Sequence, residues 1–309
     1  MPINLEIFQK NLTYEITATV EQIWEDLNKI VAIDRNAESQ QAKFGKLLTI
    51  FIVGAVVSIL LAFASLFLPT TADGSITSLA VAIFILGLVV GGGFIVAAIY
   101  AGMRQGRYSR LNLPDYRHEL LKKVLEMLKR DMEDDANVSV RLVLSPSNQK
   151  NKLIKTVPHR YQSGFQVDIF RDEWLNVTGQ FLDKSHFILS TTELSQTKHG
   201  WKRSRSGKSK YKSKSKSQGA LISLTLKYPT NRYGAVKILK DEVMGAVKLP
   251  EASEIKRLRL TDKSINLTVK ISPSNSENED NLYQTITMML LSIYQVLNLG
   301  RILSKKKEA

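Results

Sequence analysis

The sequence of 309 residues contains no cysteine. This absence excludes disulfide bonds, thiolate metal sites and a cysteine nucleophile. The four histidines, His118, His159, His186 and His199, match no metal-binding spacing. A P-loop, a GxSxG nucleophile motif and a strand-associated GxGxxG are missing as well. The sequence therefore predicts a protein without a catalytic site, a cofactor or a bound metal.

Two adjacent acidic pairs are the remaining catalytic candidates. Asp172 is followed by Glu173, and Asp241 is followed by Glu242. Because carboxylates in polar stretches are mostly solvated, we expect neither pair to be catalytic. A catalytic site assembled from residues far apart in the chain would leave no sequence motif, so an enzyme stays an open alternative.

Charge is almost absent between residues 47 and 103, where Asp73 is the one charged side chain. Two apolar runs, Leu47–Leu68 and Leu79–Met103, are separated there by the polar stretch Pro69–Ser75. A helix over the 22 residues of the first run measures about 33 Å, and the hydrocarbon core of a bilayer is about 30 Å thick. We therefore predict a transmembrane hairpin of two helices. No cleavable leader is expected, because the first apolar run follows a long acidic segment.

The flanking charges predict the orientation of this hairpin. Asp73 lies between the two runs, and basic residues lie at their outer ends: Lys43, Lys46, Arg104, Arg107 and Arg110. The positive-inside rule then places both termini in the cytoplasm and the connecting turn outside. We expect the chain to reside in a plasma, inner or internal membrane as a multi-pass protein.

Small residues recur at helical spacing in both runs. Gly54, Ser58 and Ala62 share an arc of the first predicted helix, and Gly87 and Gly91 form a GxxxG pair in the second. Small side chains let helix backbones approach closely in lipid. We expect these residues to pack the hairpin internally, and self-association into a homo-oligomer is the alternative. The absence of charged residues from both runs argues against a proton-coupled transporter.

The segments outside the membrane predict an α+β domain. Residues 1–46 carry five basic and seven acidic side chains, whereas residues 104–309 carry 38 basic and 21 acidic ones. Apolar residues alternate from Leu12 to Ala18 and again in several runs after residue 137, which indicates strands. Helical periodicity spans residues 20–34 and 114–135. Strands that are grouped rather than alternating with helices favour an antiparallel sheet with flanking helices. The strand near residue 12 is expected to join that sheet.

The chain is thus divided into an N-terminal cytoplasmic segment (1–46), a hairpin (47–103) and a basic cytoplasmic domain (104–309). The final helix, residues 279–304, has an uncharged middle that resembles a third membrane span. Gln284, Gln295 and Asn298 interrupt it, and a third crossing would carry the terminal lysines outside. We therefore expect a soluble helix that packs against the sheet, or partly against the membrane surface or another subunit.

A basic tract is the most distinctive feature of the domain. Between residues 202 and 216 it holds eight basic residues and no acidic one. They are Lys202, Arg203, Arg205, Lys208, Lys210, Lys212, Lys214 and Lys216. Such a composition cannot bury a core, so residues 202–219 are expected to form a flexible loop. The tract could contact anionic lipid headgroups, bind nucleic acid through phosphates or have no partner.

Three functional hypotheses follow from this architecture. The first is a membrane-anchored, non-enzymatic interaction module or scaffold whose basic domain contacts anionic headgroups or a protein partner. The second is a homo-oligomeric channel or pore, suggested by the glycines of the second apolar run. The third is a membrane-tethered nucleic-acid binder. The first is favoured, because the positive charge is concentrated in residues 104–309.

Overall fold

The computed structural model describes residues 5–67, 78–203, 207–233, 236–239, 245 and 247–308. The chain divides into two compact units, one made of Met1–Leu27 with Pro114–Ala309 and the other of Asn28–Leu113. The predicted turn at 69–75, Arg205 and the pair Asp241–Glu242 lie outside the described residues. Each unit is described by itself below.

Two long helices, α2 (Val20–Ser65) and α3 (Ser78–Ser109), form the unit Asn28–Leu113. The amphipathic helix that was expected to end near Asp34 instead continues without a break into the first apolar run. The two helices are antiparallel, because Phe44 stacks on Tyr108 near one end and Phe63 meets Phe84 near the other. The prediction of two long apolar helices is therefore confirmed.

The apolar side chains of this pair point mostly outward. Only 11% of the most apolar window of α2 and 6% of that of α3 is buried. Leu60, Leu86 and Val96 are each more than 60% exposed. Among the described residues, α2 and α3 are the two helices that are long and apolar enough to cross a membrane, and α7 (Glu279–Glu308) is not one of them.

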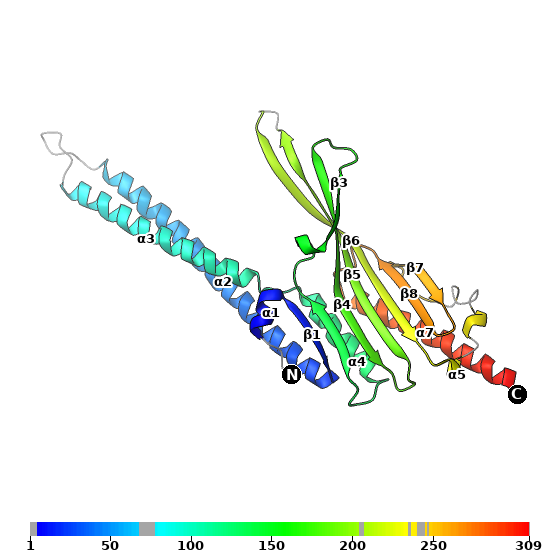
Figure 1. Ribbon diagram of the computed structural model, residues 1–309. Helices are drawn as coiled ribbons and strands as arrows, with labels where there is room; N and C mark the ends of the chain where they lie inside the picture. The colour runs from blue at the N-terminus through cyan, green and yellow to red at the C-terminus, as the bar shows by residue number, and fades with distance from the viewer. Residues whose placement is uncertain are drawn as a thin grey trace. The chain divides into compact units, whose positions relative to one another are not determined.

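The other unit is built on an antiparallel sheet of eight strands in the described chain, in the order β1-β2-β4-β5-β6-β8-β7, with β3 added beside β4 (Figure 1). β1 comes from the N-terminal segment and pairs with β2 over its whole length, as the sequence predicted. The strands are β1 (Thr13–Ala18), β2 (Val138–Val143), β3 (Leu153–Pro158), β4 (Phe165–Gln180), β5 (His186–Arg203), β6 (Ser209–Lys227), β7 (Ser253–Leu260) and β8 (Ser264–Ile271).

Helices α4 (Asp115–Lys129) and α7 contact each other and cover one face of this sheet (Figure 1). Their apolar stripes, for example Leu121 and Val124 of α4 and Ile286 and Ile293 of α7, are fully or almost fully buried. The expectation that the final helix packs against the sheet is thereby confirmed. Short helical segments complete the unit: α1 (Leu5–Asn11), η1 (Lys150–Lys152), α5 (Thr230–Tyr233) and η2 (Val236–Leu239).

The expected flexible loop over residues 202–219 is wrong for most of its length. β5 runs on to Arg203 and β6 begins at Ser209, and the two strands stay paired between those residues and the core. The loop was expected because these side chains cannot be buried. A strand that begins in the core can nevertheless be extended by backbone hydrogen bonds alone, since every residue supplies a donor and an acceptor.

Candidate anion-binding surface

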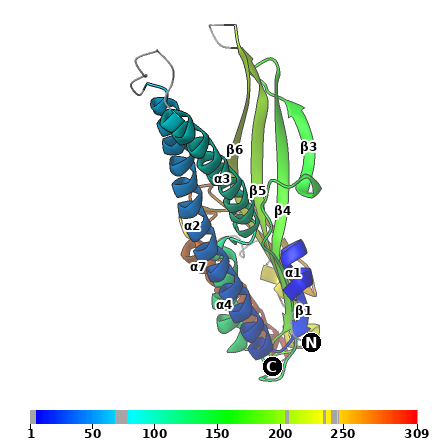
Figure 2. The ribbon, with the colours of Figure 1, turned by 90° about the vertical axis from the view of Figure 1, so that its left-hand side faces the viewer.

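Strands β5 and β6 extend together beyond the helix-covered part of the sheet, and β4 stays paired with β5 as far as Gly200 (Figure 2). We call residues 195–203 and 209–217 the basic ribbon. It begins at a bulge between Leu194 and Ser195, opposite Gly219. Gly219 has a φ of 97°, and a Cβ there would collide with the carbonyl oxygen of Ile271. A glycine is therefore required where the covered part of the sheet becomes the ribbon.

Strand alternation gathers the lysines of the ribbon on one of its faces. Cross-strand partners share a face, and so do residues two positions apart. Lys202 lies opposite Lys210, and Lys198 lies opposite Lys214. Six lysines share this lysine face: Lys198, Lys202, Lys210, Lys212, Lys214 and Lys216. Within the described chain, no carboxylate forms an ion pair with any of them, so the face is strongly positive.

Strands β3 and β4 place apolar side chains beside the lysines. Phe165 and Val167 of β4 are register partners of Gly200 and Lys198, so they lie on the same face. The Lys198 ammonium lies 5.0 Å from the centre of the Phe165 ring, within cation–π range. A shallow hollow at this place is lined by Phe165 together with Lys198, Lys202, Lys212 and Lys214. This arrangement offers several ammonium groups to one anionic surface.

The opposite face of the ribbon carries aromatic and hydroxyl side chains. Trp201 and Tyr211 are partners in the β5–β6 register, and their ring centres are 5.5 Å apart. His199, Ser213 and Ser215 lie on this face as well. The ribbon is therefore two-sided: the six lysines lie on one face, and Trp201 and Tyr211 lie on the other together with Arg203.

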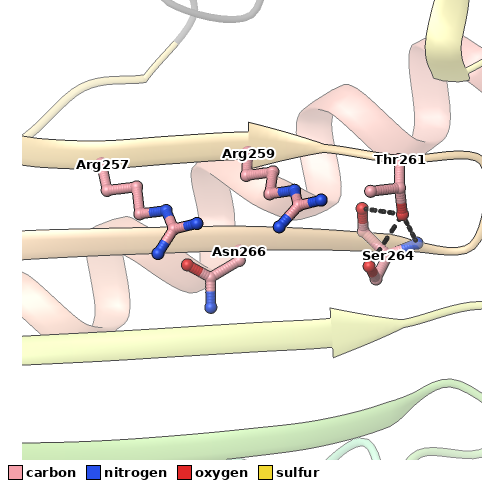
Figure 3. A pocket seen from close by; sticks show the side chains of 5 residues that line it. All are labelled: Arg257, Arg259, Thr261, Ser264 and Asn266. Atoms are coloured by element: carbon pink, nitrogen blue, oxygen red, sulfur yellow. Dashed lines mark hydrogen bonds between the residues drawn. The ribbon is translucent and has the colours of Figure 1, made fainter.

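A second polar hollow lies on the sheet face away from α4 and α7, where β7 meets β8. Arg257 and Arg259 extend from β7 over Asn266 of β8 (Figure 3). Thr261 and Ser264 close its end, where the Thr261 hydroxyl oxygen accepts a hydrogen bond from the Ser264 amide at 3.0 Å. The hollow is open, and its charge has the same sign as the lysine face.

A buried cluster of charges lies inside the sheet domain. Asp172 and Glu193 are cross-strand partners on β4 and β5, and Arg117 of α4 pairs with both, at 3.0 and 2.7 Å. Lys152 pairs with Asp172 at 2.9 Å. The side chains of Arg117 and Asp172 are 3% and 2% exposed. The expectation that Asp172 is a solvated carboxylate is therefore wrong, because α4 and η1 bring two cations against it.

The environment perturbs the titrating groups of this cluster. Burial lowers the pKa of the Lys152 ammonium, and its ion pair with Asp172 opposes that shift. Burial raises the pKa of the Tyr116 hydroxyl, which donates a hydrogen bond to Glu193. With two cations and two carboxylates the cluster balances its charge, which is typical of a structural network.

The residues predicted for anion contact lie mostly along the ribbon. Lys202 and Arg203 end β5, and Lys208 immediately precedes β6. Within the tract, Arg203 belongs to the aromatic face rather than to the lysine face. Lys198 was missed, because it lies before the basic tract that begins at Lys202. Lys155 of β3 was missed as well, because its place beside Ile169 on the lysine side depends on strand pairing.

The predicted helix-packing residues lie between α2 and α3. A Cβ at Gly87 would come within 2.8 Å of the Ala62 Cβ, and one at Gly91 within 3.6 Å of the Ser58 Cβ. Gly54 lies against the Phe94 ring in the same way, at 3.1 Å. By contrast, nothing lies within 4 Å of a Cβ at Gly92 or Gly93. The small residues thus allow close approach inside the pair.

Among the residues that the structure describes, no group of three or more His, Asp or Glu side chains is arranged to hold a metal ion. Comparisons with family models, with curated proteins and with solved structures found no match for this chain. The geometry of the ribbon and the helix pair is therefore the basis for a functional proposal.

Proposed function

We propose that this protein is a membrane-anchored, non-enzymatic interaction module whose basic ribbon binds the phosphates of anionic lipid headgroups. The observation that carries the proposal is the lysine face. Six lysines on one face of the basic ribbon, without a carboxylate partner in the described chain, suit a surface of many negative charges. Each basic residue near an anionic leaflet contributes about 1 kcal/mol, so the face as a whole supplies useful affinity.

The helix pair supports the membrane part of the proposal. Outward-facing side chains such as Leu60, Leu86 and Val96 would leave a large apolar surface in water. In a bilayer the same side chains contact acyl chains, and all backbone groups of a helix are satisfied internally. We propose that α2 and α3 each cross the membrane and that both termini lie in the cytoplasm, as the flanking basic residues favour.

The test is hydrogen exchange of the full chain in nanodiscs. We expect the amides of the basic ribbon to exchange more slowly in nanodiscs that contain an anionic lipid than in neutral ones. The effect should weaken at high salt, because salt screens the attraction. Equal exchange in both lipids at low salt would overturn the proposal. So would slowing by an added oligonucleotide but not by anionic lipid.

Matched variants make this test specific. One variant removes three lysines of the ribbon, and the other removes three exposed lysines elsewhere in the same domain. They are K210S/K212S/K214S and K150S/K256S/K263S. Both lose the same charge, so only the first should lose the lipid-dependent protection. A similar loss in both variants would mean that net charge, and not the ribbon, attracts the membrane.

The channel hypothesis has less support. Of its motivating glycines, Gly87 and Gly91 lie against Ala62 and Ser58 within the pair, and Gly92 and Gly93 have no neighbour within 4 Å and remain available for self-association. A nucleic-acid binder shares the lysine face with the lipid proposal. The nanodisc experiment separates the two, since it compares anionic lipid with an oligonucleotide on the same ribbon.

A further inference from the structure

Two large aromatic side chains are exposed near the end of the basic ribbon. The Trp201 side chain is 66% exposed and that of Tyr211 is 54% exposed. They meet edge to face, with 69° between the ring planes. Both lie two residues from the pair Arg203 and Ser209, which ends the described part of the ribbon. An exposed aromatic pair next to a cationic face needs an explanation beyond the core of the domain.

A chain of polar contacts across four strands holds this pair. The Tyr211 hydroxyl lies 2.9 Å from Nδ1 of His199, and Nε2 of His199 lies 3.0 Å from a carboxylate oxygen of Asp168. The Thr156 hydroxyl donates a hydrogen bond of 2.6 Å to the other carboxylate oxygen. Tyr211 is thus hydrogen-bonded to His199 of β5, which lies beside Asp168 of β4, and its ring packs against Trp201. The exposed aromatics are held in place.

The two-sided layout discriminates between polyanions. A single-stranded nucleic acid stacks its bases on aromatics while its backbone follows cations in the same groove. Here Trp201 and Tyr211 lie on the face opposite the six lysines, so a strand that follows those lysines cannot stack its bases on this pair. An element that inserts into a membrane interface contacts lipid on both of its faces. There Trp and Tyr favour the level between headgroups and acyl chains, and lysines reach the phosphates.

We propose that the basic ribbon inserts end-on into the headgroup layer of an anionic membrane, with Trp201 and Tyr211 as interfacial anchors. This inference rests on the proposed lipid-binding function and specifies its mode. The lysine face neutralises headgroup phosphates on one side of the ribbon. The aromatic pair on the other side displaces water at the boundary with the acyl chains, which adds an attraction independent of salt.

Quenching of tryptophan fluorescence by brominated acyl chains tests the insertion. The chain has three tryptophans, and Trp174 is fully buried in the sheet domain. The full-length protein and W201F are compared in anionic nanodiscs with and without brominated lipid, with W24F as the control. We expect brominated lipid to quench the fluorescence of the unmodified protein and of W24F, and to quench that of W201F less. Equal quenching of the original chain and W201F overturns the inference.

The result separates this inference from the proposed function. If anionic lipid slows exchange of the ribbon while Trp201 is not quenched, the insertion fails and surface binding stands. If neither effect occurs, both proposals fail. If an oligonucleotide changes the Trp201 fluorescence while brominated lipid does not, the aromatic pair binds nucleic acid and the insertion is overturned. Because Trp201 is exposed, W201F is not expected to disturb folding.

Discussion

Arg117 is the residue on which the charge balance inside the sheet domain depends. Its guanidinium donates hydrogen bonds to the Val143 carbonyl at 2.8 Å and to Glu193 at 2.7 Å, and it lies 5.2 Å from the Trp174 ring. The planar fork of arginine suits this geometry, whereas lysine would offer a single point charge. Arg117 therefore connects α4 to the two strands that continue toward the ribbon.

We predict that R117M destabilises the sheet domain by about 3–5 kcal/mol, because it leaves buried carboxylates without a partner. Urea unfolding of the full chain in detergent, followed by tryptophan fluorescence, measures this change. R117M/E193Q should recover part of the loss, since it removes one of the uncompensated charges.

The matched control is R141M. Arg141 is 55% exposed and lies 3.7 Å from Glu15. Removal of such a surface pair should cost less than about 1 kcal/mol. If R117M costs no more than R141M, the buried network does not stabilise the domain.

His118 should make this domain sensitive to acid. Its side chain is 2% exposed, and burial lowers its pKa below the ordinary value of 6.5, against the opposing influence of Glu119. The folded state therefore prefers the neutral ring, and the unfolded state binds the proton more tightly. The resulting stability is fully present above pH 6.5 and is lost as the pH falls through the lower folded-state pKa.

We predict that H118Q removes the part of the acid sensitivity of folding that is due to His118. Urea midpoints measured from neutral to mildly acidic pH should fall less steeply for H118Q than for the original chain, because the amide does not titrate. Identical pH profiles would show that His118 contributes nothing to acid sensitivity.

At the scale of elements, the packing of α2 against α3 can be tested without removing native thiols, because the chain has no cysteine. A Cβ at Gly91 would lie 3.6 Å from the Ser58 Cβ, and disulfides need about 3.5–4.5 Å between Cβ atoms. We predict that S58C/G91C forms an intramolecular disulfide in membranes under mild oxidation. Gel mobility before and after reduction measures the product.

The control for this pair is S58C/G92C, since Gly92 faces open space. It should form little monomeric disulfide. A cross-linked dimer from S58C/G92C, together with failure of S58C/G91C, would contradict the packing and favour self-association.

Local sequence patterns indicate some of these strands and not others. The hairpin of β7 and β8 follows from local signals, namely its alternating residues and the turn Thr261–Ser264. The ribbon was missed, since lysine and serine have no strong strand propensity and most of its side chains are not buried. Its strands exist because they continue Leu221–Lys227 and His186–Leu194, which are in the core. Strand length was set by pairing and not by composition.

At the scale of the whole molecule, the sheet domain is discontinuous in sequence. Residues 1–27 join residues 114–309, and the helix pair is inserted between them. Strand β1 therefore belongs to the domain completed after the second apolar helix. If the helices span a membrane, both parts of this domain must lie on the same side of it.

Single-cysteine labelling tests this topology. In intact cells we predict that D73C reacts with a membrane-impermeant maleimide, and that K43C and R110C react only after permeabilisation, following the positive-inside rule. Labelling of K43C and R110C from outside would reverse the orientation. Labelling of only one of them from outside would exclude a hairpin.

The apolar helices and the location of the positive charge could be read from the sequence by itself, because both are properties of contiguous residues. The lysine face, the aromatic pair and the cluster around Arg117 were decided only by the tertiary structure. The cluster unites residues far apart in the chain, Arg117 with Asp172 and Glu193, whereas the lysine face and the aromatic pair depend on the register of two neighbouring strands. Strand register and helix docking determine which of these side chains share a face, and a shift of one residue in register would separate them.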